Sequence, residues 1–204
     1  MSEEAVAIPR VMTLELATNS VRNTTFSTSD DDPYYEVVTR FWHPHVTKIN
    51  KLDLVSGAMN TVCEINNEGS DVKIRFASND PDKITVEPVQ RGKKTNGPPL
   101  GEWVSTESIL KLAPERPGGI FTDSDGTRYR WKTHNRNLLL IRCDDDTRLP
   151  VAVYHRYKRH LGFWRMRKHA QLEIKQPDVI KNMEGLIATY LLVERQRRHP
   201  ISLK

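Results

Sequence analysis

The sequence predicts a mostly β protein: a single, roughly twelve-stranded, closed or nearly closed β-barrel with a hydrophobic C-terminal helix buried inside it. Two observations predict this fold class. Short runs rich in β-branched and aromatic residues, separated by turn residues, follow one another from residue 11 to residue 175. The segment 178–198 instead repeats apolar residues at the three- and four-residue steps of a helix.

The expected strands are short and nearly regularly spaced. They cover residues 11–17, 34–42, 45–53, 60–66, 71–77, 83–89, 127–132, 137–143, 151–158 and 170–175. Turn residues at 67–69 and 123–126 separate two pairs of them, and a polar loop covers 90–101. Ser105 or Thr106 is expected to cap a short helical turn over 107–112. We expect one domain over 11–198, between a flexible tail over 1–10 and a short tail over 199–204.

The C-terminal helix is apolar on both faces. One face is lined by Val179, Ile180, Met183, Leu186, Ile187, Tyr190 and Leu191. On the opposite face, residues 185–193 are apolar or uncharged as well. A helix that is apolar all round must be buried, and in a β protein the natural place is inside the barrel. The side chains expected to be almost fully buried are Leu186, Ile187, Tyr190 and Leu191.

Positive charge is concentrated in the C-terminal quarter of the chain. Residues 151–204 contain twelve Lys and Arg against four Asp and Glu, whereas residues 1–150 contain nineteen against twenty-two. The whole chain has a net charge of +5. This distribution favours an anionic partner near the C-terminus: membrane headgroups, nucleic acid or an acidic protein.

The sequence predicts a cytoplasmic protein, with peripheral attachment to a membrane as a further expectation. The first residues lack the apolar core of a secretory signal, and no apolar run reaches the roughly 20 residues that span a bilayer. In the reducing cytosol, Cys63 and Cys143 are expected to be unpaired. Both lie in strand-like runs, and we expect the Cys143 side chain to point inward.

Several phrases of the sequence resemble a known family. They are the runs 35–39, 46–49, 125–132 and 151–154, followed by the C-terminal helix. In this order they resemble an uncharacterised family of basidiomycete fungal proteins, a domain of unknown function. That family is similar in turn to the tubby, LURP-one-related and phospholipid scramblase group. The resemblance covers about residues 11–198 and implies a barrel with a helix through its centre. Tubby proteins bind phosphoinositides in a basic pocket, and none of the residues of that pocket is carried over to this chain.

The strongest candidate site in the sequence is the basic and aromatic stretch 154–169, with a hairpin tip expected at 161–164. Its candidate ligand-binding residues are Arg156, Lys158, Arg159, Trp164, Arg165, Arg167 and Lys168. A basic rim around an aromatic tip suits an anionic membrane surface. The same composition suits single-stranded nucleic acid, which is the less favoured ligand. Two solvated strands with no binding role are an equally weighted alternative.

The sequence contains none of the familiar catalytic motifs. It has no G-x-S-x-G, no H-E-x-x-H, no P-loop and no dinucleotide fingerprint, so we expect neither enzymatic activity nor a cofactor. His43 and His45 share one side of an extended segment, but no third ligand accompanies them, and we expect no metal. The residues at 123–126 begin like a calcium loop, yet the twelfth position is His134 rather than Glu.

These observations favour a non-enzymatic intracellular binding module that attaches to anionic membrane lipid through its C-terminal basic strands. A protein-interaction or regulatory domain without lipid affinity is the first alternative. An enzyme with an unrecognised site is the second.

Overall fold

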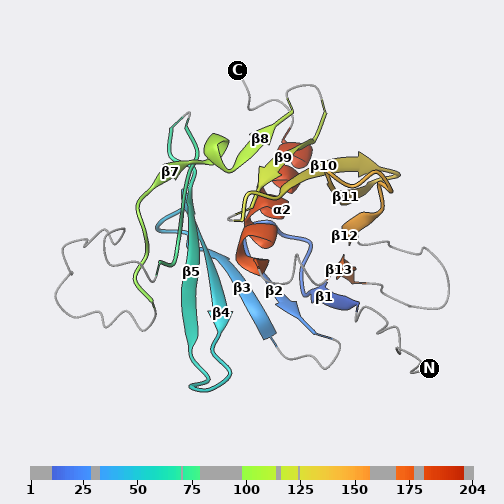
Figure 1. Cartoon of the computed structure of the whole chain (residues 1–204). Helices are drawn as coiled ribbons and strands as arrows, with labels where there is room; N and C mark the ends of the chain where they lie inside the picture. Colours follow the sequence, from blue (N-terminus) through green and yellow to red (C-terminus); the bar gives the residue numbers. More distant parts are fainter. Residues whose placement is uncertain are drawn as a thin grey trace.

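The computed structural model describes residues 11–28, 33–69, 71–78, 98–113, 116–123, 125–156, 169–176 and 182–199. Within these ranges, thirteen strands form one antiparallel sheet, and a C-terminal helix lies against it (Figure 1). The predicted fold class, mostly β with one C-terminal helix, is therefore confirmed. The predicted strand at 83–89 lies outside the described residues.

The strands are β1 (Met12–Leu16), β2 (Thr24–Ser27), β3 (Pro33–Thr39), β4 (Val46–Leu52), β5 (Met59–Asn66), β6 (Lys73–Phe76), β7 (Val104–Ser105), β8 (Leu110–Leu112), β9 (Gly118–Thr122), β10 (Arg128–His134), β11 (Asn137–Arg142), β12 (Pro150–His155) and β13 (Ala170–Ile174). Their order in the sheet is β7-β6-β5-β4-β3-β2-β1-β13-β12-β11-β10-β9-β8. Every pair of neighbours is consecutive in the chain except β1 and β13, which pair antiparallel and join the two halves of the sheet.

The sheet is open between β7 and β8, so the prediction of a closed barrel is not met by the described strands. These edge strands are joined by the 3-10 turn η2 (Thr106–Ser108). Backbone groups around this turn bond to other strands. The Thr106 N–H donates to the Val72 carbonyl beside β6, and the Thr122 N–H of β9 donates to the Ile109 carbonyl. Because β7 and β8 have only two and three residues, few backbone groups are left to close the ring.

The region around η2 differs from the sequence prediction in one further way. Ser105 is the N-cap of η2 and accepts from the Glu107 N–H, as predicted. The helical turn ends at Ser108, however, and Leu110–Leu112 is strand β8 rather than helix. Pairing with β9 explains this difference. Leu110 and Leu112 are two residues apart, so they lie on the same face of β8, and Leu110 is buried in the core.

Helix α2 (Met183–Arg198) supplies the centre of the core (Figure 1). The ten consecutive residues from Gly185 to Glu194 are buried, so the helix is covered on every side. The helix begins at Met183, after its N-cap Asn182, so the start predicted at 178 is wrong, whereas the predicted end at 198 is confirmed. Asn182 caps the helix by accepting from the Gly185 N–H at 3.1 Å.

Strands from both halves of the sheet contact the helix. The ring of Tyr190 meets those of Phe26 on β2, Trp131 on β10 and Tyr154 on β12, with centroids 4.7–6.4 Å apart. The Trp131 ring N–H donates to the Thr189 hydroxyl at 3.1 Å, which satisfies both buried polar groups. The four side chains predicted to be almost fully buried are 0–4% exposed: Leu186, Ile187, Tyr190 and Leu191. This prediction is confirmed.

Ion pairs and hydrogen bonds attach both ends of the helix to the rest of the fold. Near its start, Glu184 accepts from the Tyr35 hydroxyl and from the Lys51 ammonium, both at 3.0 Å. Burial, together with the nearby Glu184 carboxylate, raises the pKa of Tyr35 far above its ordinary value. Near its end, Arg197 and Arg198 bind the buried Glu194 of the same helix, and they also donate to the backbone carbonyls of Arg136 and Asn19 outside the helix. These contacts fix the helix along its axis as well as around it.

The two cysteines are both free, as predicted. Cys63 lies in the core, and burial raises the pKa of its thiol well above the ordinary value. Cys143 is exposed, so the prediction that it points inward is wrong. The reason is that β11 ends at Arg142, and Cys143 already belongs to the following turn. No helix in the described part of the chain is long and apolar enough to cross a membrane.

Candidate functional site

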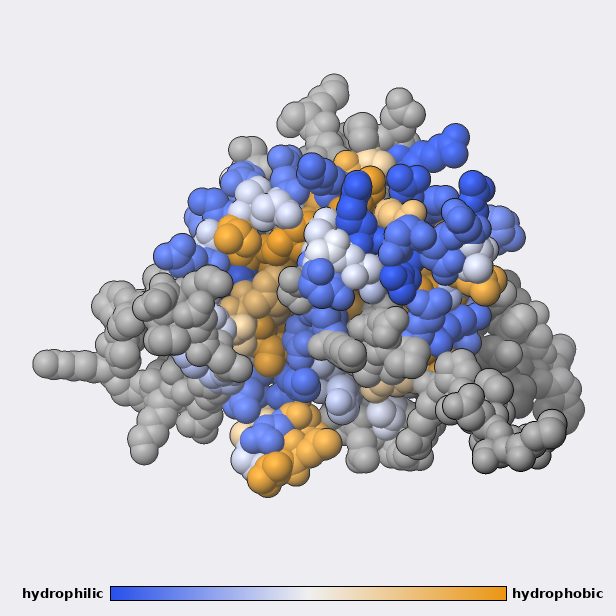
Figure 2. Space-filling model, in the orientation of Figure 1, coloured by the Kyte–Doolittle hydropathy of each residue, from blue (hydrophilic) through white to orange (hydrophobic). Residues whose placement is uncertain are grey.

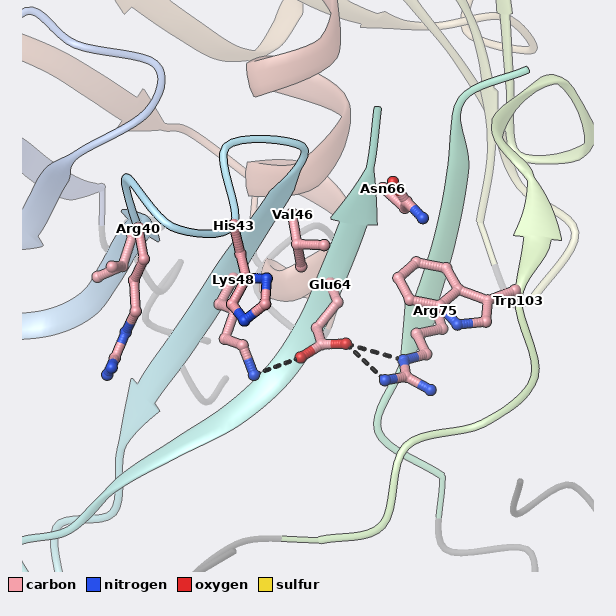
Figure 3. Close-up of a pocket in the computed structure, with 9 residues that line it drawn as sticks. Arg40, His43, Val46, Lys48, Glu64, Asn66, Arg75 and Trp103 are labelled. Carbon is pink, nitrogen blue, oxygen red and sulfur yellow. Dashed lines mark hydrogen bonds and ion pairs between the residues drawn. The ribbon is translucent and has the colours of Figure 1, made fainter. Parts of the chain in front are cut away.

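A pocket of about 350 Å³ opens over strands β3–β6 (Figure 3). It is lined by Val38, Arg40, His43, Val46, Lys48, Glu64, Asn66, Arg75 and Trp103. The lining comes from four neighbouring strands, from the β3–β4 turn and from the residue just before β7. The pocket is therefore built on a continuous part of the sheet.

Strand alternation turns the charged residues of this pocket away from the core. In β4, Ile49 is fully buried in the core, so its neighbour Lys48 points to the outer face. In β5, Cys63 and Ile65 belong to the core, so Glu64 between them also points outward. The pattern in β6 is the same. The outer face of β4–β6 thus presents one charged side chain per strand at the same level.

Glu64 lies at the centre of this outer row. It is directly opposite Lys48 on β4 and Arg75 on β6. One carboxylate oxygen lies 2.6 Å from Lys48 Nζ, and the other accepts from Arg75 Nε and Nη2 at 2.9 and 2.7 Å. The side chains of Glu64 and Arg75 are only 4% and 9% exposed. Burial acts to raise the pKa of Glu64, but Lys48 and Arg75 outweigh it and hold this pKa below its usual range.

An aromatic ring forms one wall of the pocket. The guanidinium carbon of Arg75 lies 4.4 Å from the centre of the Trp103 ring. Trp103 comes immediately before β7, which pairs with β6, and this pairing brings the ring over Arg75 (Figure 3). A guanidinium stacked on an indole face is attracted by the ring electrons. Arg75 is therefore held from one side by a carboxylate and from another by an aromatic face.

The β3–β4 turn forms the rim of the pocket and carries two exposed aromatic residues. Arg40 and His43 line the pocket, and between them Phe41 is 85% and Trp42 53% exposed. The two rings pack edge to face with their centroids 4.6 Å apart, and the Arg40 guanidinium lies 5.2 Å from the Trp42 ring. Exposed aromatic side chains thus stand directly beside a charged pocket.

The pocket attracts anions. It contains three permanent cations, Arg40, Lys48 and Arg75, against the single carboxylate of Glu64, so two positive charges are in excess. Within the described ranges Arg40 forms no ion pair, and the Lys48 side chain is 45% exposed. Both can donate to an incoming phosphate or carboxylate, and Arg40 offers the fork of donors that fits such a group.

Of the residues predicted from the sequence to bind a ligand, only Arg156 is among those that the structure describes. Arg156 is exposed and follows the last residue of β12. The other six lie outside the described residues: Lys158, Arg159, Trp164, Arg165, Arg167 and Lys168. Whether these side chains share one face therefore stays a prediction.

Sequence reasoning missed the pocket for two reasons. The run Tyr34–Trp42 was expected to be one strand, but β3 ends at Thr39, which leaves Phe41 and Trp42 in a turn. The sequence did indicate this turn, because Pro44, two residues after Trp42, favours a turn. The row of charges was hidden because it depends on the cross-strand register.

Within the described residues, the structure is mostly β with one C-terminal helix, and the lining of the pocket over β3–β6 carries an excess of positive charge. The chain belongs to the Family of unknown function (DUF6593), whose model matches residues 19–199. No curated protein and no solved structure matches the chain. The predicted membership of an uncharacterised domain family is thereby confirmed, whereas the resemblance to the tubby, LURP-one-related and scramblase group gains no support and stays a prediction.

Proposed function

We propose that the protein is a non-enzymatic binding module that attaches to an anionic membrane surface through the pocket over β3–β6. In this proposal, a headgroup phosphate occupies the pocket while Phe41 and Trp42 enter the interface. The observation that carries it is the juxtaposition of an exposed aromatic pair with a pocket that has two positive charges in excess.

Each part of this juxtaposition has a role at a membrane. Tryptophan prefers the headgroup level of a bilayer, where its ring is half in hydrocarbon and its N–H can reach water. Phe41 adds apolar area that is exposed in the free protein. Arg40, attached to the same turn, would meet the phosphate at the depth that these rings set. Lys48 lies deeper in the pocket and would bind the same phosphate through its ammonium.

The basic stretch 154–169 adds to this proposal as a second contact. Its cations would strengthen attachment electrostatically, by on the order of 1 kcal/mol for each Lys or Arg near the surface. The resemblance to the tubby group favours a phosphoinositide as the lipid. A protein-interaction domain without lipid affinity and an enzyme with an unrecognised site are the competing functions, and both predict that vesicles are ignored.

Co-sedimentation with vesicles tests the proposal. The protein should bind phosphatidylcholine vesicles that contain phosphatidylserine or phosphatidylinositol bisphosphate, and should bind pure phosphatidylcholine vesicles much more weakly. Binding should weaken as salt rises. A wild-type protein that ignores the anionic vesicles at low salt would remove the membrane function.

Variants separate the pocket rim from other surfaces. The double change Phe41→Ser and Trp42→Ser should weaken binding by tenfold or more, since burying one aromatic side chain contributes roughly 2 kcal/mol. Arg40→Ser should weaken it about fivefold. The matched control is Leu54→Ser with Val55→Ser. These two residues are 74% and 98% exposed at the other end of β4, where Figure 2 shows hydrophobic residues at the hairpin tip. An equal loss in the control would contradict the assignment to the rim.

The contribution of the stretch 154–169 is tested separately. The triple change Arg165→Ala, Arg167→Ala and Lys168→Ala should weaken vesicle binding further, by up to about a hundredfold. It should leave the thermal midpoint nearly unchanged. Full binding by this variant, together with loss in the rim variant, would assign attachment to the pocket alone.

A further inference from the structure

A second cationic surface lies on strand β10, apart from the pocket. The outward residues of this strand are all basic: Arg128, Arg130, Lys132 and His134. All four are exposed, while Tyr129 and Trp131 between them are buried in the core. Because outward side chains of a strand recur every second residue, they stand about 6.6 Å apart in one row. We call this row the β10 ladder.

The neighbours of the β10 ladder carry no compensating charge. Arg130 is opposite Ile120 on β9 and Ile141 on β11, and Lys132 is opposite Gly118 and Leu139. Within the described part of the chain, Arg128, Arg130 and Lys132 form no ion pair. The nearest outward residue beyond Ile120 is Lys111 on β8, which adds a further positive charge.

Other parts of the outer face are arranged differently. Lys48 and Arg75 are paired with Glu64, and His155 lies 3.2 Å from Glu173 on the next strand. Like charges that face one another on a sheet are destabilising, and opposite charges across strands are the usual remedy. The β10 ladder lacks this remedy, so its charge is uncompensated in the free protein.

The spacing and the surroundings of the ladder select among anionic partners. An extended peptide presents every second side chain on one face at the same period as β10, so acidic residues at alternate positions can each meet one cation. The side chains opposite Arg130 and Lys132 on β9 and β11 are aliphatic or absent and only partly exposed, and no exposed aromatic ring stands on β9–β11 to stack on a base. These three strands, all within the described residues, therefore also lack the exposed aromatic side chains that anchor a protein in a membrane.

We propose that the outer face of β9–β11 binds an extended acidic peptide segment of a partner protein, with one carboxylate for each cation of the β10 ladder. The peptide lies along β10 with its carboxylates toward Arg128, Arg130 and Lys132. Ile120, Leu139 and Ile141, which lie opposite Arg130 and Lys132 on the neighbouring strands, would provide an apolar floor beneath their methylene stems. This inference is independent of the membrane proposal, because it uses a different part of the sheet (Figure 1).

Fluorescence anisotropy with labelled peptides and the full chain tests the inference. The probe is a peptide of about twelve residues in which Glu alternates with Thr. Its competitor has the same composition but places all Glu residues in one block. The alternating peptide should bind at low salt, at least about threefold more tightly than the block peptide, and both should weaken as salt rises.

The variant for this test is Arg130→Ser with Lys132→Ser. It should weaken binding of the alternating peptide about tenfold or more, since each truncated cation removes one charge-assisted contact. The control is Arg22→Ser with Lys73→Ser, which removes the same charge from exposed positions elsewhere and should change binding less than twofold. Circular dichroism checks that both variants are folded.

Three outcomes would overturn the inference. Equal loss in the control variant would show that only net charge matters. Equal binding of alternating and block peptides would show that the spacing of the ladder is not read. Binding of a thymidine oligonucleotide or of phosphatidylserine vesicles that depends on Arg130 and Lys132, with no binding of the alternating peptide, would assign the ladder to nucleic acid or to lipid.

Discussion

Charged side chains on the outer face of the sheet are arranged in two ways. Over β4–β6, Glu64 lies between Lys48 and Arg75 and pairs with both across the strands. Over β10, Arg130 and Lys132 meet only aliphatic residues and glycine on the neighbouring strands. In the first region Glu64 compensates part of the positive charge within the fold, and the excess on the pocket lining is what the proposed phosphate would meet. In the second region the positive charge has no partner within the described part of the fold, so it is available to a binding partner.

The largest expected effect concerns the paired region. Glu64→Ala should lower the free energy of unfolding by about 3 kcal/mol, because it removes the carboxylate that two nitrogens of the buried Arg75 bind. Arg130→Ala on the ladder should change this free energy by no more than about 0.5 kcal/mol. Urea denaturation of both variants measures the difference. Equal effects at the two positions would show that the two regions do not differ energetically.

A second expectation uses the pKa of Glu64, which Lys48 and Arg75 hold below its usual range. A carboxyl whose folded pKa is lowered stabilises the fold above its unfolded pKa, about 4.3 for Glu, and loses this contribution as the pH falls through the folded pKa. The free energy of unfolding of the wild type should therefore exceed that of Glu64→Gln by the largest amount near neutral pH, and this difference should shrink below about pH 4.3. Arg130→Gln should show no such change, since arginine stays charged throughout. A gap for Glu64→Gln that is constant down to about pH 3 would contradict the pairing.

The smallest effect has the opposite sign. Arg130→Glu should raise the free energy of unfolding by a few tenths to about 1 kcal/mol, because the new carboxylate would stand between Arg128 and Lys132 and remove their mutual repulsion. Lys48→Glu in the paired region should lower stability instead, since it sets two carboxylates against each other. Thermal or urea unfolding at low and high salt distinguishes the two variants, and the stability gain of Arg130→Glu should decrease as salt rises. A loss of stability in Arg130→Glu would mean that the ladder is compensated after all.

Much of the fold could be predicted from local patterns. The all-round apolar character of 185–193 predicted a buried helix, and alternation along 46–52 and 128–134 marked strands with one face in the core. Such patterns are repeated within a few residues and reflect burial directly. The ends of elements were less predictable. β3 stops before Phe41 and β11 stops before Cys143, because the following turns, rather than the propensities of these residues, decide where pairing ends.

The sites depended on information that a linear sequence does not contain. Lys48, Glu64 and Arg75 come together only through the register of β4, β5 and β6, and Trp103 joins them only through the pairing of β7 with β6. The basic residues of the β10 ladder do alternate along the sequence, but the sequence prediction assigned them no role, and their significance comes from uncharged neighbours on β9 and β11. A sequence shows runs of charged residues directly. Whether a charged side chain has a partner is visible only in the three-dimensional structure.

The position of helix α2 in the chain has a consequence for biosynthesis. Every strand precedes the helix that fills their shared interior, and β1 finds its partner β13 only shortly before that helix is made. A nascent chain therefore exposes the apolar faces of its strands until the helix has been made. Contacts this distant in sequence form slowly, and uncovered strands at high concentration associate with one another. We therefore expect this fold to assemble more slowly, and to associate more readily during folding, than one whose core is built from neighbouring segments.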